Sequence, residues 1–348
     1  MRAVVIHRPG GYESLRVETL ADPAPPKRGE VAIDVRAAGI NYADVVIRMG
    51  FYKSQKELVG WPVTPGFEVA GVVSAVGEGV TRVKAGDAVF AGTLFGGYAS
   101  KIVVPGDQVF PVPARWTVEQ AAGFPTVYLT AYYALFELAH PRPGANLLIH
   151  SAAGGVGLAM TQLARIAGCR TTGVVGSSAK IDVARANGCD EVIDKSREDL
   201  WAAAKRIEPG GFDVIADANG PATLKDSYRH LASAGKLVVY GFSGMMPRQG
   251  GRVTWREWPG LVKDFVKIPR FNPMDLTMDN KSVLAFNLSY LFERKAILTE
   301  AVGRMLEWEA QGKIALTPVR AYPIDRVAEA HAAIESGTTT GKLVLTMD

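Results

Sequence analysis

Short apolar runs fill the first third of the chain, and turn residues separate them. The runs AVVIH, LRVETL, EVAIDVRAAGI, FEVAGVVSAVG, DAVFAG and YASKIVV each have the length and side chains of a strand, and Gly, Pro or Asp stands between them. This pattern predicts β-structure with many turns as far as about Val118. From there VEQAAGFPTVYLTAYYALFEL has the periodicity of a helix.

Strand-like and helix-like segments alternate through the middle of the chain. Four strands are predicted at residues 146–151, 170–176, 212–220 and 235–243, with helical segments between them. Such alternation is typical of a doubly wound α/β fold with a parallel sheet. A further strand-like run at residues 282–291 precedes a long helix, and a closing strand is predicted at residues 341–347.

The turn after the first of these strands carries the most specific motif. It reads AAGGVG at residues 152–157 and joins a strand to a helix, which is the dinucleotide fingerprint with Ala152 replacing the first glycine. A helix N-terminus offers unpaired N–H groups to phosphates. Glycines also serve purely structural turns, but this context favours a dinucleotide site. Its predicted members are Ala153, Gly154, Gly155, Val156 and Gly157.

The end of the second strand indicates which dinucleotide binds. An NAD site usually places Asp or Glu there to hold the ribose 2′-hydroxyl, but residues 172–179 contain no carboxylate. Gly176, Ser177 and Lys180 stand there instead, and hydroxyl and ammonium groups favour a 2′-phosphate. The alternative is that Ser177 caps the next helix, Lys180 is solvated and Asp182 binds the ribose. We favour NADPH.

Two other strand ends are expected beside the cofactor, because ligands of doubly wound sheets bind beyond the carboxyl ends of the strands. The alternative is that these positions are simple turns. The predicted cofactor-lining residues are Asn219, Gly241, Phe242 and Ser243.

Composition limits the class of protein. A length of 348 residues predicts two domains, and 48% hydrophobic and 21% charged residues are ordinary for a globular chain. A net charge of +4 is too small to indicate a nucleic-acid or membrane partner. No apolar run reaches membrane-span length and no signal peptide is evident, so we expect a cytoplasmic protein. Cys169 and Cys189 are expected to be buried, inert thiols.

Several ordered motifs carry a family resemblance over essentially the whole chain. They are AAGINYADVVIRMGFY, PVTPGFEVAGVVSAVGEGV, KAGDAVF, AAGGVG, GKLVVYGFS and GKLVL. Through them the chain resembles the zinc-less quinone oxidoreductase branch of the medium-chain dehydrogenase/reductase superfamily, near zeta-crystallin, and looks closest to the vesicle amine transport protein group.

The resemblance implies a split architecture. A Rossmann doubly wound parallel sheet of residues 126–290 would be inserted into a GroES-like (chaperonin-10-like) β-rich catalytic domain of residues 1–125 and 291–348. It also implies a homodimer that pairs the edge strands of the nucleotide domains. The run at residues 282–291 is the candidate edge, because an exposed apolar edge strand needs covering.

Metal catalysis is not expected. Zinc-dependent relatives carry a Cys in the loop that here spans residues 39–44, where this chain has none, and a His where this chain has Phe67. Asp44 and Glu68 remain, but two carboxylates without imidazole or thiolate make a poor zinc site. Without a metal to stabilise an alkoxide, a plain alcohol is a hard substrate, whereas an electrophilic acceptor such as a quinone or an α,β-unsaturated carbonyl needs less help.

Matching family positions imply individual roles at the site. Asn41 would anchor the nicotinamide ribose or the acceptor, and Tyr52 would donate to the acceptor oxygen, although Val46 replaces a second family tyrosine. Tyr52 and Thr130 both have the alternative of simple packing. The positions expected near the nicotinamide are Thr130, Phe286 and Asn287.

The segment from Met245 to Phe286 leaves two functions open. It mixes aromatic residues such as Trp255 and Phe265 with basic residues such as Lys263, and it could be a substrate lid or a helical packing element. Our main hypothesis is a zinc-independent, NADPH-dependent reductase of a small-molecule quinone or enone, with no nucleic-acid or membrane partner. The alternative is an NADPH-binding protein with little turnover that acts through a protein, nucleic-acid or membrane partner.

Overall fold

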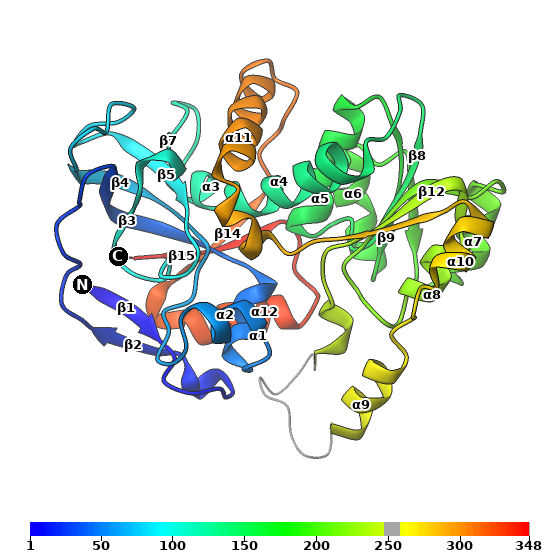
Figure 1. Ribbon diagram of the computed structural model, residues 1–348, viewed down its shortest axis with the longest axis horizontal. Helices are drawn as coiled ribbons and strands as arrows, with labels where there is room; N and C mark the ends of the chain where they lie inside the picture. The colour runs from blue at the N-terminus through cyan, green and yellow to red at the C-terminus, as the bar shows by residue number, and fades with distance from the viewer. Residues whose placement is uncertain (247–257, 348) are drawn as a thin grey trace.

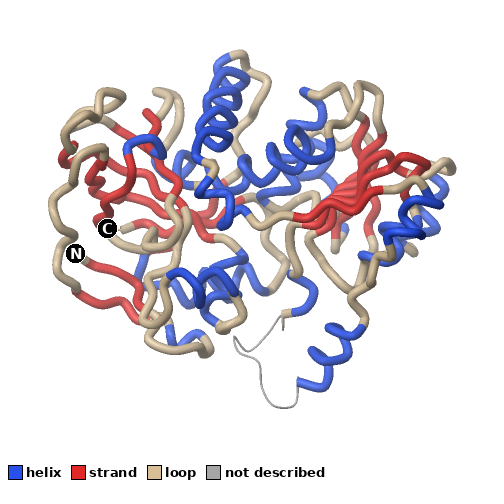
Figure 2. Tube along the Cα trace, viewed as in Figure 1, coloured by secondary structure: helices blue, strands red, loops and turns tan. Residues whose placement is uncertain are grey.

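A computed structural model describes residues 1–246 and 258–347, so Trp255 lies outside the described residues. The chain forms two lobes, each built on its own sheet (Figure 1). Both chain ends lie in one lobe, and the other lobe is formed by the middle of the chain. Helices cover both faces of the fan-shaped sheet in the second lobe (Figure 2).

The β-rich lobe combines strands from distant parts of the sequence. Its larger sheet has the order β14-β15-β3-β4-β5-β7, with β6 also paired to β3, and a small sheet pairs β1 with β2. All of these pairs are antiparallel except β14–β15. The strands are β1 (Arg2–Val5), β2 (Arg16–Thr19), β3 (Glu30–Ile40), β4 (Glu68–Val76), β5 (Ala88–Gly92), β6 (Lys101–Pro105), β7 (Val109–Pro111), β14 (Val319–Pro323) and β15 (Lys342–Thr346).

The second lobe is the predicted doubly wound domain. Its sheet has the order β10-β9-β8-β11-β12-β13 with every pair parallel. Numbered from β8, this is the 3-2-1-4-5-6 order of dinucleotide-binding folds. The strands are β8 (Asn146–Ile149), β9 (Arg170–Val175), β10 (Glu191–Asp194), β11 (Phe212–Asp217), β12 (Leu231–Val239) and β13 (Ser282–Ala285).

Helices connect these strands and join the lobes. In the second lobe they are α5 (Gly155–Ile166), η4 (Ser178–Lys180), α6 (Ile181–Ala186), α7 (Leu200–Ile207), α8 (Leu224–Arg229), η5 (Ser243–Met245), α9 (Trp258–Val266), α10 (Pro273–Asp279) and η6 (Leu288–Glu293). The others are η1 (Tyr12–Ser14), α1 (Tyr42–Arg48), α2 (Lys53–Leu58), η2 (Gly106–Gln108), α3 (Val118–Ala122), α4 (Pro125–Tyr132), η3 (Tyr133–Ala139), α11 (Lys295–Ala310), η7 (Ile324–Arg326) and α12 (Val327–Glu335).

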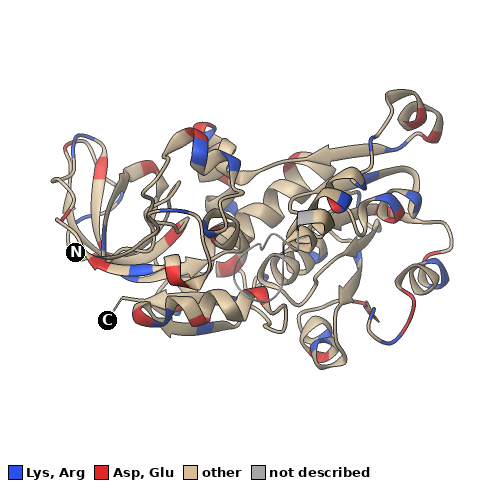
Figure 3. Ribbon diagram, turned by 90° about the horizontal axis from the view of Figure 1, so that it is seen from below, with Lys and Arg blue, Asp and Glu red and all other residues tan. Residues whose placement is uncertain are grey.

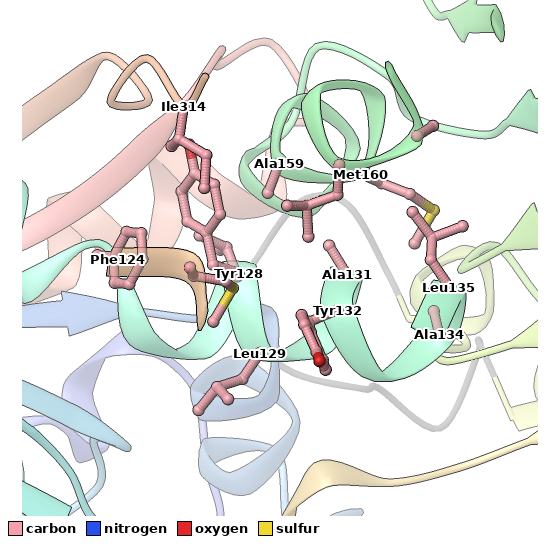
Figure 4. Packing of buried hydrophobic residues seen from close by; sticks show 14 of the residues in the cluster. Phe124, Tyr128, Leu129, Ala131, Tyr132, Ala134, Leu135, Ala159, Met160 and Ile314 are labelled. Carbon is pink, nitrogen blue, oxygen red and sulfur yellow. The ribbon is translucent and has the colours of Figure 1, made fainter. Parts of the chain in front are cut away.

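The helix α4 holds the two lobes on one continuous core. Its apolar side chains pack against Ala159 and Met160 of α5 and against Ile314 (Figure 4). The same cluster contains Phe90 from the first sheet and Val214 from the second. Burial of this core therefore fixes α4, and with it Thr130, between the sheets.

Some sequence predictions need correction. The strand predicted at residues 282–291 ends at Ala285, and residues 288–293 form a short 3₁₀ helix instead. The side-chain oxygen of Asn287 accepts the Ser289 N–H at 3.0 Å and so begins that helix. The strands β7, β10 and β14 were not predicted. The domain boundaries near residues 125 and 291 remain a prediction.

The two cysteines are buried, as predicted, and unpaired. Burial raises the pKa of Cys169 to about 11, and burial also raises the pKa of Cys189. Thiols with raised pKa values are poor nucleophiles at neutral pH, so neither suits a reactive centre. No helix among the described residues has the length and apolar character needed to cross a membrane.

Candidate functional site

The glycine turn is built by close backbone packing. A Cβ on Gly157 would lie 2.4 Å from the carbonyl oxygen of Ser151 and 2.7 Å from Cα of Ala152. No side chain fits at these distances, so α5 can begin this close to β8 only with glycine at position 157. The twelve-residue helix α5 thus directs its first N–H groups beyond the carboxyl end of the sheet.

The β-rich lobe touches this turn directly. The N–H of Gly341 donates to the carbonyl oxygen of Ala153 at 3.0 Å, and Gly154 and Gly341 form a parallel bridge. Because Gly341 immediately precedes β15, the closing strand of the first sheet is held against the fingerprint. The predicted residues Ala153 to Gly157 therefore lie at the junction of the lobes.

The end of β9 contacts the other lobe through Lys180. Its Nζ donates to the carbonyl oxygens of Gly337 and Thr339, at 2.6 and 2.8 Å. Ser177 makes no side-chain capping bond to the following turn. The role of Ser177 and Lys180 toward a 2′-phosphate remains a prediction, and Lys180 also links the lobes.

The end of β11 is organised by a buried carboxylate. Asp217 accepts the N–H groups of Asn219 at 2.8 Å and Gly220 at 3.2 Å, and the hydroxyl of Ser227 at 2.8 Å. His150, which is also fully buried, lies 3.1 Å from the Ser227 hydroxyl. This buried network fixes the turn that presents Asn219, and its enclosure excludes nucleophilic catalysis by Ser227.

The ends of β11 and β12 are joined to one another. The N–H and the hydroxyl of Ser243 each donate to the carbonyl oxygen of Ala218 at 2.9 Å. The Tyr42 hydroxyl from α1 in turn donates to the carbonyl oxygen of Ser243 at 3.2 Å. The carboxyl ends of β11 and β12 therefore bring together four predicted residues: Asn219, Gly241, Phe242 and Ser243. Tyr42, which the sequence did not single out, reaches them from the other lobe.

Asn41 lies in a buried polar network between the lobes. Its Nδ2 donates to Glu68 at 2.9 Å, and its Oδ1 accepts Nζ of Lys342 at 2.5 Å. The Lys342 ammonium is also 2.6 Å from Glu68, and both side chains are almost fully enclosed. The second Glu68 oxygen accepts the N–H of Thr126 at 2.7 Å, one helical turn before Thr130 on α4. Both ends of the Asn41 amide thus have protein partners.

A second buried carboxylate fixes the same region. Asp44 accepts the N–H groups of Asn41 at 2.8 Å and Gly66 at 2.9 Å, and the Tyr98 hydroxyl at 3.0 Å. Burial raises the pKa of the Asp44 carboxyl to about 7, although these hydrogen bonds oppose the shift. Asp44 therefore holds the loop of Asn41 against the loop of Phe67.

Aromatic rings line the position where zinc-dependent relatives carry a histidine. Phe67 packs 5.9 Å from the ring of Tyr52, edge to face, and 5.3 Å from the ring of Phe95. Among residues 1–246 and 258–347, no group of three or more His, Cys, Asp or Glu side chains is arranged to hold a metal ion. An apolar wall of this kind suits a planar acceptor.

Tyr52 connects this wall to the second lobe. Its hydroxyl donates to Oδ1 of Asn287 at 3.2 Å and lies 2.7 Å from the hydroxyl of Ser289. Phe286 packs 4.9 Å from the ring of Tyr133 in the segment that continues α4. The structure thus brings together Tyr52, Phe286 and Asn287 from the predicted set. A separate, shallow apolar crevice is lined by residues of β5, α4 and α11, among them Phe90, Leu129 and Leu298.

The matches to known proteins cover both lobes. A model of the alcohol dehydrogenase GroES-like domain matches residues 27–114, and a model of zinc-binding dehydrogenases matches residues 187–345. The synaptic vesicle membrane protein VAT-1 homolog of Rattus norvegicus is 34% identical over 348 residues, covering 99% of this chain and 84% of the relative. A quinone oxidoreductase of Pongo abelii is 31% identical over 354 residues, covering 99% of this chain and 97% of the relative.

A solved structure has the same arrangement. The Escherichia coli quinone oxidoreductase complexed with NADPH superposes with a TM-score of 0.84 at 31% identity, and the match covers 100% of both chains. A likeness over the full length of both chains includes the relation between the two lobes as well as each sheet.

Proposed function

Because the chain belongs to the medium-chain dehydrogenase/reductase superfamily, in its zinc-less quinone oxidoreductase branch, we propose that it reduces quinones or α,β-unsaturated carbonyls with NADPH and without a metal. The fold class predicted from the sequence is confirmed: a Rossmann sheet stands beside a GroES-like β-rich domain. The acceptor class, the hydride transfer and the roles of single residues are the proposal.

The observation that carries the proposal is the ion pair between Lys342 and Glu68. Glu68 follows the position at which zinc-dependent relatives carry a zinc-binding histidine. Here the buried ammonium group of Lys342 lies 2.6 Å from the Glu68 carboxylate. A carboxylate already neutralised by a lysine is a poor ligand for a dication. Phe67 beside it offers a ring in place of an imidazole.

The glycine turn and its neighbours fit a dinucleotide. The backbone at Gly157 has no room for a side chain, so no side chain projects from this position in the first turn of α5. Near it, Nδ2 of Asn219 is buried and has no hydrogen-bond partner among the described residues, while its Oδ1 accepts from Ser151 at 3.4 Å. A buried amide donor of this kind is suited to an acceptor oxygen on a bound ligand.

NADPH, when bound, would supply the hydride. The protein would position the acceptor against the aromatic wall of Phe67 and Phe95 and exclude water around it. The Tyr52 hydroxyl would donate a hydrogen bond to the acceptor oxygen, where negative charge develops during reduction. Burial raises the pKa of Tyr52, so the hydroxyl stays protonated and able to donate at neutral pH. Asn41, which Glu68 and Lys342 hold in place, would contact the nicotinamide ribose or the acceptor.

The direct test is oxidation of NADPH and NADH by the purified, metal-free chain with quinones, enones and simple aldehydes. We expect turnover with NADPH and a quinone or enone, and a loss of the preference for NADPH in Lys180→Glu. Turnover only after a metal is added would contradict the zinc-independent mechanism, and a preference for NADH would contradict the cofactor assignment.

One observation favours the second candidate, an NADPH-binding protein with little turnover. On α9, Phe265 and Val266 are 70% and 77% exposed, and Lys263 and Lys267 are exposed beside them. Elsewhere, acidic and basic residues are mixed along the ribbon (Figure 3). An apolar and basic helix that projects from the lobe suits a partner surface. Tight NADPH binding without reduction of any acceptor would favour this candidate.

We also propose a homodimer that pairs β13 with its copy. β13 is the last strand in the order of its sheet, and it is bonded on one side to β12. A short strand edge of this kind is commonly covered by association. Sedimentation analysis should show a dimer in the unmodified chain and a monomer in Val283→Pro, since proline removes an N–H and is poorly tolerated in a paired strand. A monomeric unmodified chain would contradict the proposal.

A further inference from the structure

A buried serine of the second lobe lies beside the hydroxyl of Tyr52. The Ser289 Oγ is 2.7 Å from the Tyr52 hydroxyl oxygen, and Ser289 is only 5% exposed. Ser289 stands in the first turn of η6, where its N–H donates to Oδ1 of Asn287 at 3.0 Å. Just before Asn287, the N–H of Phe286 donates to the carbonyl oxygen of Val239 in β12 at 3.3 Å. The parallel sheet and these backbone bonds therefore fix where the Ser289 hydroxyl lies.

The direction of this hydrogen bond follows from the single proton of the Tyr52 hydroxyl. A tyrosine hydroxyl has one proton to donate, and its oxygen can also accept. The Tyr52 proton is donated to Oδ1 of Asn287 at 3.2 Å, because that oxygen can only accept. In the 2.7 Å contact Ser289 is therefore the donor and the Tyr52 oxygen is the acceptor. The two hydroxyls form a chain in which the bond from Ser289 strengthens Tyr52 as a donor.

The two partners of Tyr52 differ in how easily they can be exchanged. The bond to Asn287 is long for an O–H···O bond, and the same Oδ1 already accepts the Ser289 N–H. An acceptor oxygen that gains negative charge would attract the Tyr52 proton more strongly than a neutral amide does. Turning the hydroxyl from Asn287 to that oxygen moves only the proton, and the ring stays packed edge to face against Phe67, 5.9 Å away. The bond from Ser289 is kept during this exchange.

The electrostatic surroundings of Tyr52 agree with this geometry. Burial raises the pKa of Tyr52, and among the contacts that lower it the bond with Ser289 has the largest effect. A donated hydrogen bond lowers a pKa because it stabilises the negative charge that the phenolic oxygen takes on as it gives up its proton. Ser289 thus offsets part of the effect of burial and keeps Tyr52 an effective donor.

We propose that Ser289 is a positioning residue for the reaction, which holds the Tyr52 oxygen and directs the Tyr52 proton toward the acceptor oxygen. The inference rests on the proposed function, because that function gives Tyr52 the role of donor. Ser289 acts only through Tyr52 and does not touch the acceptor. A purely structural role would instead tie the turn after β13 to the β-rich lobe, and the experiments below separate the two roles.

The first experiment is steady-state kinetics of the full chain with NADPH and an enone or quinone. Ser289→Ala should lower kcat by about tenfold and change KM by less than about twofold, because the lost bond matters most when charge develops on the acceptor. Ser289→Thr keeps a hydroxyl and should recover most of kcat. Ser100→Ala is the matched control and should keep the kcat of the unmodified chain, since the Ser100 hydroxyl only accepts the Arg2 N–H at 2.9 Å in the β-rich lobe.

A double-mutant cycle with Tyr52→Phe distinguishes positioning from packing. If Ser289 acts through the Tyr52 hydroxyl, adding Ser289→Ala to Tyr52→Phe should lower kcat by less than about twofold. A packing defect would lower kcat by the same factor in both backgrounds, and that result would overturn the inference. Full kcat in Ser289→Ala alone would overturn it as well.

Binding of an oxyanion tests the inference without any turnover. Para-nitrophenolate is a planar oxyanion that resembles an enolate, and its absorbance reports binding to the full chain in the presence of NADP⁺. Ser289→Ala should weaken this binding by about tenfold where Tyr52 is present and by less than about twofold in Tyr52→Phe. A chain that shows this pattern yet reduces no acceptor would support the positioning of Tyr52 by Ser289 and contradict the proposed function. Equal weakening in both backgrounds, or no binding by the unmodified chain, would contradict the inference even in an active reductase.

Discussion

The hydroxyl of Tyr52 donates a hydrogen bond to Oδ1 of Asn287, which lies 235 residues further along the chain. The two positions were expected near different parts of the reaction, Tyr52 near the acceptor and Asn287 near the nicotinamide. Their contact crosses from the β-rich lobe to the turn after β13. It places a hydroxyl donor, an amide and the ring of Phe67 in one small region.

Replacing Tyr52 by Phe should lower kcat/KM for the acceptor by about 100-fold, since a positioned hydroxyl donor contributes on this scale. The affinity for NADPH should change little, and the free energy of unfolding should fall by about 1 kcal/mol for the lost hydrogen bond. Steady-state kinetics and urea unfolding measure the two effects. Tyr290→Phe is the control, because that hydroxyl bonds the exposed Glu57 at 2.8 Å. Equal losses in both variants would refute a specific role.

The Asp44 carboxyl should make stability depend on pH. Its pKa is about 7 in the folded chain and close to 4 when unfolded. A raised folded pKa gives stability that is complete below pH 4 and is lost as the pH rises to about 7. Between pH 5 and 7 the free energy of unfolding should fall by roughly 2 to 3 kcal/mol through this group.

Asp44→Asn isolates this effect. In the variant, the Asp44 contribution to the pH dependence should vanish, so the unmodified chain should lose stability relative to the variant as the pH rises from 5 to 8. Urea unfolding at several pH values gives the profiles. Parallel profiles for the two proteins would show that Asp44 does not titrate in this range.

The buried pair of Lys342 and Glu68 should be costly to break on one side. Lys342→Met leaves the Glu68 charge enclosed without its partner, and we expect a loss of about 3 to 5 kcal/mol in the free energy of unfolding. Adding Glu68→Gln should restore much of that loss, because no charge is then left buried. A double-mutant cycle measures the coupling. Additive effects of the two substitutions would contradict it.

Gly157→Ala should damage both the turn and the affinity for NADPH. The new Cβ meets the Ser151 carbonyl, and relieving the clash should cost about 1 to 3 kcal/mol and weaken NADPH binding at least about tenfold. Gly303→Ala on α11 is the control, since nothing lies within 4 Å of its Cβ position. That variant should gain roughly 0.5 to 1 kcal/mol and bind NADPH as before. Normal binding by Gly157→Ala would remove the turn from the cofactor site.

Strong periodicity made most of the fold predictable from the sequence. Strands such as β3 and β9 are long, rich in β-branched residues and bounded by turn residues, so local pattern identified them. β10 is only four residues long and is separated from α6 by a four-residue turn, and its pairing with β9 is a tertiary contact. The strand predicted at residues 282–291 ends at Ala285, because the side chain of Asn287 accepts the backbone N–H of Ser289 and so replaces a partner strand.

The site was predictable only in part. The fingerprint at residues 152–157 and the strand ends follow from local sequence and one topological rule. The partners of Asn41 do not, since Lys342 is 301 residues away and arrives through the pairing of β15 with β3. The reach of Tyr42 to Ser243 also depends on how the lobes meet. Such contacts leave no trace in spacing along the chain.

The late position of Lys342 sets an order of events during synthesis. Glu68 leaves the ribosome 274 residues before the lysine that neutralises it, which at typical elongation rates is about 15 to 55 s. The Rossmann strands β8 to β13 are all made within that interval. The inserted domain can therefore fold while the lobe that surrounds it is still incomplete. Until β15 pairs with β3, the Glu68 carboxylate in the β-rich lobe lacks its lysine partner. The β-rich lobe is therefore the last part of the molecule to become native, and it is the part that a chaperone would bind.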